Sequence, residues 1–524
     1  MSPMRQLGKV IAKAMEGGVP GAIPRDLGEA LASHPPSVAD VVRLLFAESR
    51  KKRANSQLIL AFSIMLEKAL ESARWREENG SIAANDLAAT VRAAVLKERP
   101  GEKANTKALM AISRSFSAAK VDLGAELSRV IEADLELETN VDPKFVHDDL
   151  ERTFANLAEE LEHNCFLIYE QLRDLINFAP IEPRLALIAT LAASSTPSLR
   201  DAIAGFLLDA DSSVGNGVAG ILAQSASKGL VSAATVGRLV IMRNWLDEDR
   251  RSTIDAIIRA AQHKGISAAP HATAQISEIL VSPCDGAGAQ SWFVILRERR
   301  KYSIAALLNK HGFGLRDAWL RPSLTEMEAK AFLVQIEFEM SNFSSSLDRV
   351  RTALEHGVAA ALAKGEAIPF GLLQFIEATG IAPFTPREHP PEALLDQLLA
   401  DLPKERLDER TIMGALTRSK RWEESQEWLD TWFEDSEAAL AAALRGKTKK
   451  EKIGNVLQEV ISHRRRYWGE LLAWTALGVS DDPADDNAED FVLVARELLG
   501  SRPLSEIPLA VLIAKKTIEA TQGR

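Results

Sequence analysis

A stretch that occurs twice constrains the fold of this chain more than any other feature. The segment "LDADSSVGNGVAGILAQ" begins at Leu208, and "LDEDRRSTIDAIIRAAQ" begins 38 residues later at Leu246. Both open on Leu-Asp-x-Asp and close on Ala-Gln, and both carry apolar residues at helical spacing. A period near 40 residues is typical of stacked helical units that bury a shared apolar face.

The residues before the first copy supply a second helix for the unit. Pro197 stands where the first residue of a helix favours proline, and Leu199, Ile203, Phe206 and Leu207 mark one face. The unit resembles a HEAT repeat, in which a turn with Asp and then Val-Arg precedes the second helix; Asp211 and Val214 match, whereas Gly215 replaces the Arg. This resemblance covers 180–265 and implies a right-handed stack of helical hairpins with a concave groove.

The same segment contains a glycine pattern that imitates a dinucleotide-binding loop. Gly215, Gly217 and Gly220 have the spacing G-x-G-x-x-G. That motif needs a preceding strand and an acidic residue about 20 positions later, and the sequence offers neither. We therefore expect the three glycines to lie in a helix, with Ser212 or Ser213 as its N-cap.

Residues 144–178 carry apolar residues every three or four positions, from Leu150 to Leu175. This spacing predicts one continuous helix over 146–176. A helix of that length exceeds a repeat helix, so we expect it to brace two halves of the molecule; a dimerising coiled coil is the alternative.

The composition favours helices throughout the chain. Of the 524 residues, 46% are hydrophobic and only 6% aromatic, and strand signals are nearly absent. We therefore expect an all-α fold, a right-handed superhelical, HEAT-like α-solenoid in one array or in two or three lobes. The expected segments are an N-terminal helical region (1–142), a long bracing helix (143–179), HEAT-like repeats (180–265), a linker and helical region (266–367), a Pro-rich connection (368–391) and a C-terminal helical region (392–524).

Two further patterns imitate chemical sites. "ALRGKT" around Gly446 satisfies a relaxed phosphate-loop pattern, but it follows a strong helix former and not a strand. Glu160, His163 and Cys165 are the only suggestive metal ligands, yet a helical di-metal site needs the Glu-x-x-His pair twice. We expect no metal site, no cofactor and no catalytic residue, so that the chain is more an interaction protein than an enzyme.

Basic residues followed by aromatic ones are the clearest candidates for binding a partner. One cluster comprises Arg297, Arg299, Arg300 and Tyr302; the other comprises Arg464, Arg465, Tyr467 and Trp468. Such pairs can bind phosphate and stack on bases. The net charge of -10 opposes a polyanionic partner, so we expect another protein as the partner, with nucleic acid as the alternative.

Arg464 conflicts with its expected surroundings. At about 100° per residue it lies on the same helix face as Ile453, which is expected to be buried, whereas Arg466 faces solvent. Arg464 must then pair with an internal carboxylate, which we favour, or reach into a groove as a ligand anchor.

Two cysteines in the whole chain are too few for a disulfide framework, which is typical of a reducing compartment. We find neither a signal peptide nor an apolar run long enough to span a membrane. The sequence therefore predicts a non-catalytic cytoplasmic scaffold or adaptor that binds proteins in a solenoid groove. The alternative is a HEAT-like solenoid that binds nucleic acid, with or without base-excision chemistry.

Overall fold

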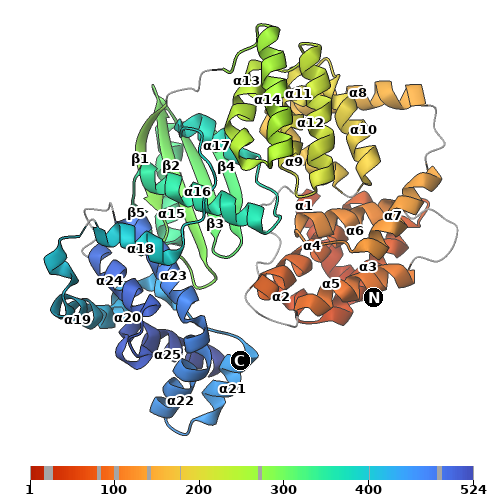
Figure 1. Ribbon diagram of the computed structural model, residues 1–524. Helices are drawn as coiled ribbons and strands as arrows, with labels where there is room; N and C mark the ends of the chain where they lie inside the picture. Colours follow the sequence, from red (N-terminus) through yellow and green to blue (C-terminus); the bar gives the residue numbers. More distant parts are fainter. Residues whose placement is uncertain are drawn as a thin grey trace. The chain divides into compact units, whose positions relative to one another are not determined.

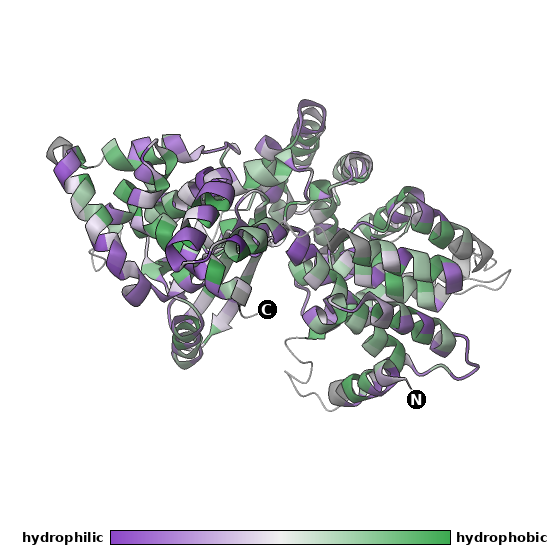
Figure 2. Cartoon of the chain, turned by 90° about the horizontal axis from the view of Figure 1, so that it is seen from below, coloured by the Kyte–Doolittle hydropathy of each residue, from purple (hydrophilic) through white to green (hydrophobic). Residues whose placement is uncertain are grey.

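The computed structural model describes residues 2–16, 27–78, 84–98, 106–138, 143–177, 179–269, 274–400, 402–480 and 487–522. The chain divides into two compact units, Met1–Phe206 and Leu207–Arg524 (Figure 1). Within each unit, hydrophobic residues lie mainly on the faces that neighbouring elements turn toward one another (Figure 2). No helix in the described ranges has both the length and the apolar character needed to cross a membrane.

The first unit is built from helices around an apolar core that is contributed mainly by its N-terminal half. Its helices are α1 (Pro3–Glu16), α2 (Leu27–Ala32), α3 (Pro35–Ser49), α4 (Ser56–Glu78), α5 (Ala84–Glu98), α6 (Thr106–Ala118), α7 (Ala125–Glu138), α8 (Pro143–Glu160), α9 (Cys165–Ile176), α10 (Ile181–Ala192) and α11 (Pro197–Ala202). The 3₁₀ helix η1 (Ile203–Leu208) continues α11, which begins at Pro197 as the sequence predicts.

The prediction of one long helix over 146–176 is wrong. α8 ends at Glu160, and α9 begins at Cys165. Glu162 and His163 both adopt positive φ angles, which end the first helix. The side chain of Asn164 then accepts the backbone N–H of Phe166 at 3.0 Å and caps the second helix. The apolar spacing persists across this turn, so periodicity alone does not reveal the break.

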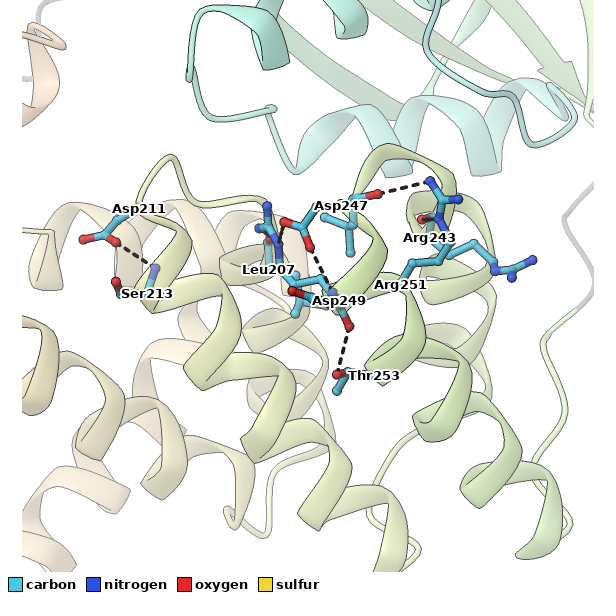
Figure 3. A network of polar contacts seen from close by, with 10 residues as sticks. Leu207, Asp211, Ser213, Arg243, Asp247, Asp249, Arg251 and Thr253 are labelled. Atoms are coloured by element: carbon cyan, nitrogen blue, oxygen red, sulfur yellow. Dashed lines mark hydrogen bonds and ion pairs between the residues drawn. The ribbon is translucent and has the colours of Figure 1, made fainter.

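The second unit opens with α12 (Ser212–Ser227), α13 (Ala233–Met242) and α14 (Glu248–His263). Residues 198–242, which are described without a gap, contain no strand, as predicted. The three glycines of the G-x-G-x-x-G pattern lie within α12, which also agrees with the prediction. The N-cap is Asp211 and not a serine: its carboxylate accepts the N–H of Ser213 at 2.8 Å (Figure 3).

The twice-occurring Leu-Asp-x-Asp sequence caps both α12 and α14, but with different aspartates. Asp211 is the second aspartate of its copy, whereas Asp247 is the first aspartate of the other copy and accepts the N–H of Arg250 at 2.9 Å. α14 therefore begins 36 residues after α12, although the sequence recurs after 38. α12 packs against α14, and both are 16 residues long.

The prediction of an all-α solenoid is wrong, because a five-stranded antiparallel sheet lies within the region expected to be linker and helix. Its order is β4-β3-β2-β1-β5. The strands are β1 (Gln275–Val281), β2 (Ala289–Glu298), β3 (Lys301–Lys310), β4 (Gly314–Leu324) and β5 (Phe343–Ser344). The central strands are covered on both faces, so they read as continuous apolar runs, which periodicity does not distinguish from buried helix.

Helices cover the two faces of the sheet. α15 (Glu326–Glu339) packs on the face formed by Phe293, Ile295, Ile304 and Ala306. α16 (Leu347–Ala363) and α17 (Gly371–Thr379) also pack against the sheet. Gly314 at the start of β4 has a φ of +84°, and a Cβ atom there would lie 2.3 Å from the backbone nitrogen of Ala361 on α16. The β3–β4 turn and α16 therefore fit together only with glycine at this position.

The rest of the unit is helical. It comprises α18 (Pro391–Ala400), α19 (Glu409–Arg418), α20 (Trp422–Ser425), α21 (Glu437–Arg445), α22 (Lys449–Val456), α23 (Ser462–Val479), α24 (Ala488–Leu499) and α25 (Pro508–Gln522). The π-helical turn η6 (Leu457–Ile461) joins α22 and α23 into one uninterrupted helical segment. Short 3₁₀ turns are η2 (Arg243–Trp245), η3 (Lys404–Leu407), η4 (Ser419–Arg421), η5 (Glu427–Thr431) and η7 (Leu504–Glu506).

Candidate functional site

The first basic cluster of the sequence forms a β-hairpin turn. Glu298 pairs with Lys301 across β2 and β3, so Arg299 and Arg300 form the two-residue loop. Arg299 has a φ of +54°, as a tight hairpin of this kind requires. Residues 297–301 are all exposed, and we call them the basic hairpin. The Arg297 guanidinium lies 5.7 Å from the centroid of the half-buried Tyr302 ring.

The outer face of α15 is the most exposed apolar surface near this hairpin. Met327, Val334 and Phe338 are 80%, 63% and 90% exposed, and Ala331 lies between them. At about 100° per residue these four side chains fall within about 60° of one another, so they form one stripe along the helix. We call them the α15 stripe. Thr325 and Glu328 form a capping box that fixes the start of α15 beside the hairpin.

The second predicted cluster lies on α23, and most of it serves internal contacts. Arg464 Nε donates to Oε1 of Glu434 at 3.0 Å, and its guanidinium lies 3.8 Å from the Tyr467 ring centroid. Trp468 is fully buried and donates its indole N–H to the same Glu434 oxygen at 2.9 Å. Arg465 donates to the backbone oxygen of Glu497 at 2.7 Å, at the C-terminal end of α24.

Arg464 therefore pairs with a carboxylate, the alternative that the sequence analysis favours, but its side chain is 43% exposed and not buried. Glu434 is the buried partner. Burial raises the pKa of Glu434, against the lowering effect of Arg464 and of the hydrogen bonds to it. Arg466 pairs with Glu392 on the exposed side of α23, where the sequence places it.

A buried polar cluster lies next to these residues on α23. His311 in the β3–β4 turn, His356 on α16 and Glu470 on α23 bring their ligand atoms to within 4.8 Å of one another. Nδ1 of His311 faces Oε1 of Glu470 at 3.7 Å, and its Nε2 faces Sγ of Cys284 at 3.4 Å. The Trp474 ring packs against both imidazoles. We call His311, His356 and Glu470 the His–His–Glu cluster.

Local electrostatics shift the pKa values of His356 and Glu470 in this cluster. Burial lowers the pKa of His356 to about 4, aided by repulsion from His311. Burial opposes the ionisation of Glu470, but the imidazole of His311, with His356 and Arg466, lowers its pKa below the ordinary value. At neutral pH the cluster thus combines a carboxylate with a neutral His356, which is the form in which both groups bind metal ions.

The order thiol, imidazole, carboxylate is also that of a nucleophilic triad. Cys284, however, is fully buried, and burial raises the pKa of its thiol far above the ordinary value. A buried thiol of this kind is inert, because neither a thiolate nor a path for substrate is available. The arrangement therefore suits a ligand-holding or structural role better than covalent catalysis.

The two sequence patterns that imitate a phosphate loop and a metal site lie at helix ends and turns, where their residues make structural contacts. "ALRGKT" spans the end of α21, and Thr448 caps α22 through a capping box with Glu451. His163 lies in the turn between α8 and α9, where its Nδ1 is 3.2 Å from Oγ of Ser198. Sequence reasoning missed the His–His–Glu cluster because its members are separated by 45 and 114 residues and have no local spacing to recognise.

Comparison with known proteins gives two family matches. Residues 180–265 match a model described as the Y4lR second domain, and residues 392–522 match one described as the Y4lR C-terminal helical domain. The chain is also similar to the uncharacterized protein y4lR of Sinorhizobium fredii (strain NBRC 101917 / NGR234). The two are 22% identical over 382 residues, which cover 72% of this chain and 73% of that protein. No solved structure matches the chain. His311 and His356 fall between the two matched ranges, and Glu470 lies in the second.

Proposed function

We propose that this chain is a non-catalytic interaction scaffold that assembles with a second copy of itself through the α15 stripe. The observation that carries the proposal is the exposure of Phe338, which is 90% open to solvent on a helix that also buries its opposite face. A helix that is apolar on both faces is expected to be covered on both. The sheet covers one face of α15, and a protein partner would cover the other.

Charge along α15 favours a second copy as this partner. The N-terminal end of the helix lies beside the basic hairpin, whose Arg297 and Lys301 interact electrostatically with Glu326 and Glu328. The C-terminal end carries the exposed acids Glu337 and Glu339. In an antiparallel pair of α15 helices, the acidic end of each copy meets the basic hairpin of the other. A two-fold interface of this kind is self-complementary in charge as well as in apolar surface.

The length of the α15 stripe indicates how strongly two copies should bind each other. From Met327 to Phe338 it extends about 16 Å at 1.5 Å per residue, which is short for a stable interface. We therefore expect a weak, reversible dimer whose population rises with protein concentration and falls with salt.

Sedimentation velocity of the full chain tests this proposal over an about hundredfold range of concentration. Val334→Asp and Phe338→Asp should each keep the chain monomeric, because each places a charge in the stripe. Leu444→Asp is the matched control, since Leu444 is 70% exposed on α21, outside the stripe. A wild-type chain that stays monomeric at every concentration contradicts the proposal. So does a dimer whose population is unchanged by Val334→Asp and by Phe338→Asp, because the interface would then lie outside the stripe.

Nucleic-acid binding is the second candidate, favoured by the exposed basic hairpin and by the stacking of Arg297 on Tyr302. A salt-dependent gel shift that is lost in the Arg299→Glu/Arg300→Glu double variant and retained in Val334→Asp would support it. The opposite pattern, dimerisation without a gel shift, would support the scaffold alone.

A further inference from the structure

The His–His–Glu cluster is assembled by parts of the fold that are held firmly in place. The backbone N–H of His311 donates to the carbonyl of Gly288 at 2.8 Å, which fixes the β3–β4 turn against the loop after β1. Trp474, one helical turn beyond Glu470, lies 4.6 Å from the His356 ring and 5.4 Å from the His311 ring between centroids. Three separate elements therefore aim their polar side chains at one point.

One polar atom at that point lacks a hydrogen bond, although it faces the carboxylate of Glu470. Nδ1 of His311 is buried and makes no hydrogen bond with any residue that the structure describes. His311 itself is only 7% exposed. The nearest acceptor, Oε1 of Glu470, is 3.7 Å away, which is too far for a hydrogen bond. A buried polar atom left in this way is costly, so a missing ligand is the simplest explanation for its placement.

The distances suit a small tetrahedral metal ion. Bonds of about 2.0–2.2 Å from zinc to nitrogen and oxygen place two ligand atoms about 3.4 Å apart. The His311–Glu470 pair is 3.7 Å apart, and the widest pair in the cluster is within 4.8 Å, so closure requires a movement of about 1.4 Å at most. Two imidazoles with one carboxylate favour zinc or another divalent transition metal over magnesium or calcium, which prefer oxygen.

We propose that Nδ1 of His311, one ring nitrogen of His356 and a carboxylate oxygen of Glu470 bind one zinc ion. Glu470 retains 24% exposure of its side chain, so water can reach the fourth position. This inference does not depend on the proposed scaffold function, because none of the three residues belongs to the α15 stripe.

Cys284 has a supporting role in this arrangement. With the metal ion on Nδ1 of His311, the other ring nitrogen, Nε2, carries the proton. This N–H donates a hydrogen bond to Sγ of Cys284, 3.4 Å away. Histidine ligands commonly donate their second N–H in this way, which fixes the orientation of the ring. Cys284 therefore lies on the far side of the imidazole and does not bind the ion itself.

His356 must change its hydrogen bonding when the ion binds. Its Nδ1 accepts the backbone N–H of His389 at 3.1 Å, so the neutral ring carries its proton on Nε2. Coordination through either ring nitrogen ends this hydrogen bond, because Nδ1 then either holds the ion or carries the proton moved from Nε2. Binding at His356 therefore costs one hydrogen bond, which the metal–nitrogen bond offsets.

Cobalt and zinc titrations of the full chain, stripped of metal with a chelator, test the proposal. We expect one equivalent of Co²⁺ to give the visible absorption of a tetrahedral site, and Zn²⁺ to displace it and raise the melting temperature. His356→Ala and Glu470→Gln should each weaken Zn²⁺ binding at least about tenfold. Cys284→Ser should still bind one equivalent.

His163→Ala is the matched control, because His163 belongs to the Glu160–His163–Cys165 pattern in the other unit. Circular dichroism of each variant shows whether it folds, and the nearly isosteric Glu470→Gln keeps the test valid if His356→Ala does not. Absence of saturable binding at one equivalent overturns the proposal, as does loss of binding in His163→Ala. A thiolate-to-cobalt charge-transfer band also overturns it, because Cys284 would then be a ligand.

Discussion

At the scale of single residues, Glu434 connects the basic segment of α23 to the core. It is buried, and it accepts hydrogen bonds from Arg464 and Trp468. Removing Arg464 leaves a buried carboxylate with less compensation, whereas Arg466 pairs with Glu392 between two exposed side chains. The two neighbouring arginines therefore contribute differently to stability.

We predict that Arg464→Ala lowers the free energy of unfolding by about 1–3 kcal/mol, and that Arg466→Ala lowers it by less than about 0.5 kcal/mol. The lower end of the range for Arg464→Ala, about 1 kcal/mol, allows for solvent screening of the partly exposed Arg464 side chain. Urea denaturation of the two variants and the wild type measures both values. Equal and negligible effects would mean that the Arg464–Glu434 pair contributes nothing to stability.

The loss of stability caused by Arg464→Ala should also depend on pH. The folded state raises the pKa of Glu434 above its ordinary value of 4.5, so the folded chain keeps this proton at a pH where the unfolded chain has lost it. Stability from this group is therefore present at low pH and falls as pH rises. Without Arg464 the pKa of Glu434 rises further, so the loss of stability should be smaller at pH 5 than at pH 8. Denaturation at the two pH values checks the sign, and a deficit that shrinks on going to pH 8 would contradict it.

The Arg464 pair shows what residue types alone can and cannot predict. An arginine among apolar helix positions indicates a carboxylate partner, because an unpaired buried guanidinium is very costly. The identity of Glu434, 30 residues away, depends on how the intervening helices turn, and local spacing carries no information about that.

At the scale of elements, the helical segments were predictable and the sheet was not. Over 198–242 the spacing of apolar residues agrees with the helices found there. β2 and β3 are buried on both faces, so their side chains do not alternate between apolar and polar. The break between α8 and α9 was also missed, because any residue other than glycine adopts positive φ only rarely, so Glu162 and His163 give no clear signal of a helix end in the sequence.

The fit between the β3–β4 turn and α16 gives a prediction at this scale. Gly314→Ala should destabilise the chain by at least about 2 kcal/mol, since the new methyl group would overlap the α16 backbone at a strained φ. Gly312→Ala is the matched control: its φ of +79° is similar, but nothing lies within 4 Å of the added atom, so a loss of about 1 kcal/mol is expected. Thermal or urea denaturation measures the difference, and equal losses would refute the close approach.

The placement of the glycine pattern within α12, and of "ALRGKT" between α21 and α22, leads to a second expectation. Neither segment follows a strand, so neither presents its backbone amides as a phosphate loop does. We predict that NAD, NADP and ATP leave the melting temperature unchanged. A saturable rise with any of them would show that one of these segments binds nucleotide after all.

At the scale of the whole molecule, the His–His–Glu cluster depends on contacts between distant parts of the sequence, and the α15 stripe does not. The α15 stripe and the basic hairpin are close in sequence, and the basic residues were identified from it. Recognising the stripe requires knowledge of which face of α15 the sheet covers. The HEAT resemblance of 180–265 stays a prediction, as does the division into six segments.

Self-association also has a consequence for the stability of the whole chain. If the dimer forms only between folded copies, the melting temperature should rise with protein concentration. Phe338→Asp should remove this dependence while leaving the melting temperature at low concentration nearly unchanged, because the side chain is exposed there. Scanning calorimetry at several concentrations checks this, and a concentration dependence that survives in Phe338→Asp would place the interface elsewhere.

The π-helical turn η6 has a consequence for how this chain compares with its relatives. A π turn accommodates about one residue more than an α-helical turn. Compared with a regular α-helix of the same residues, it therefore changes the direction of every later side chain by about 100°. Trp468, Glu470 and Trp474 all come after it. Deleting one residue from Leu457–Ile461 would restore regular α-helix and keep these side chains facing Glu434 and His311, whereas a regular α-helix formed by all the present residues would turn them away. A related chain that lacks the π turn should therefore align with this one across α22 and α23 only through a one-residue gap.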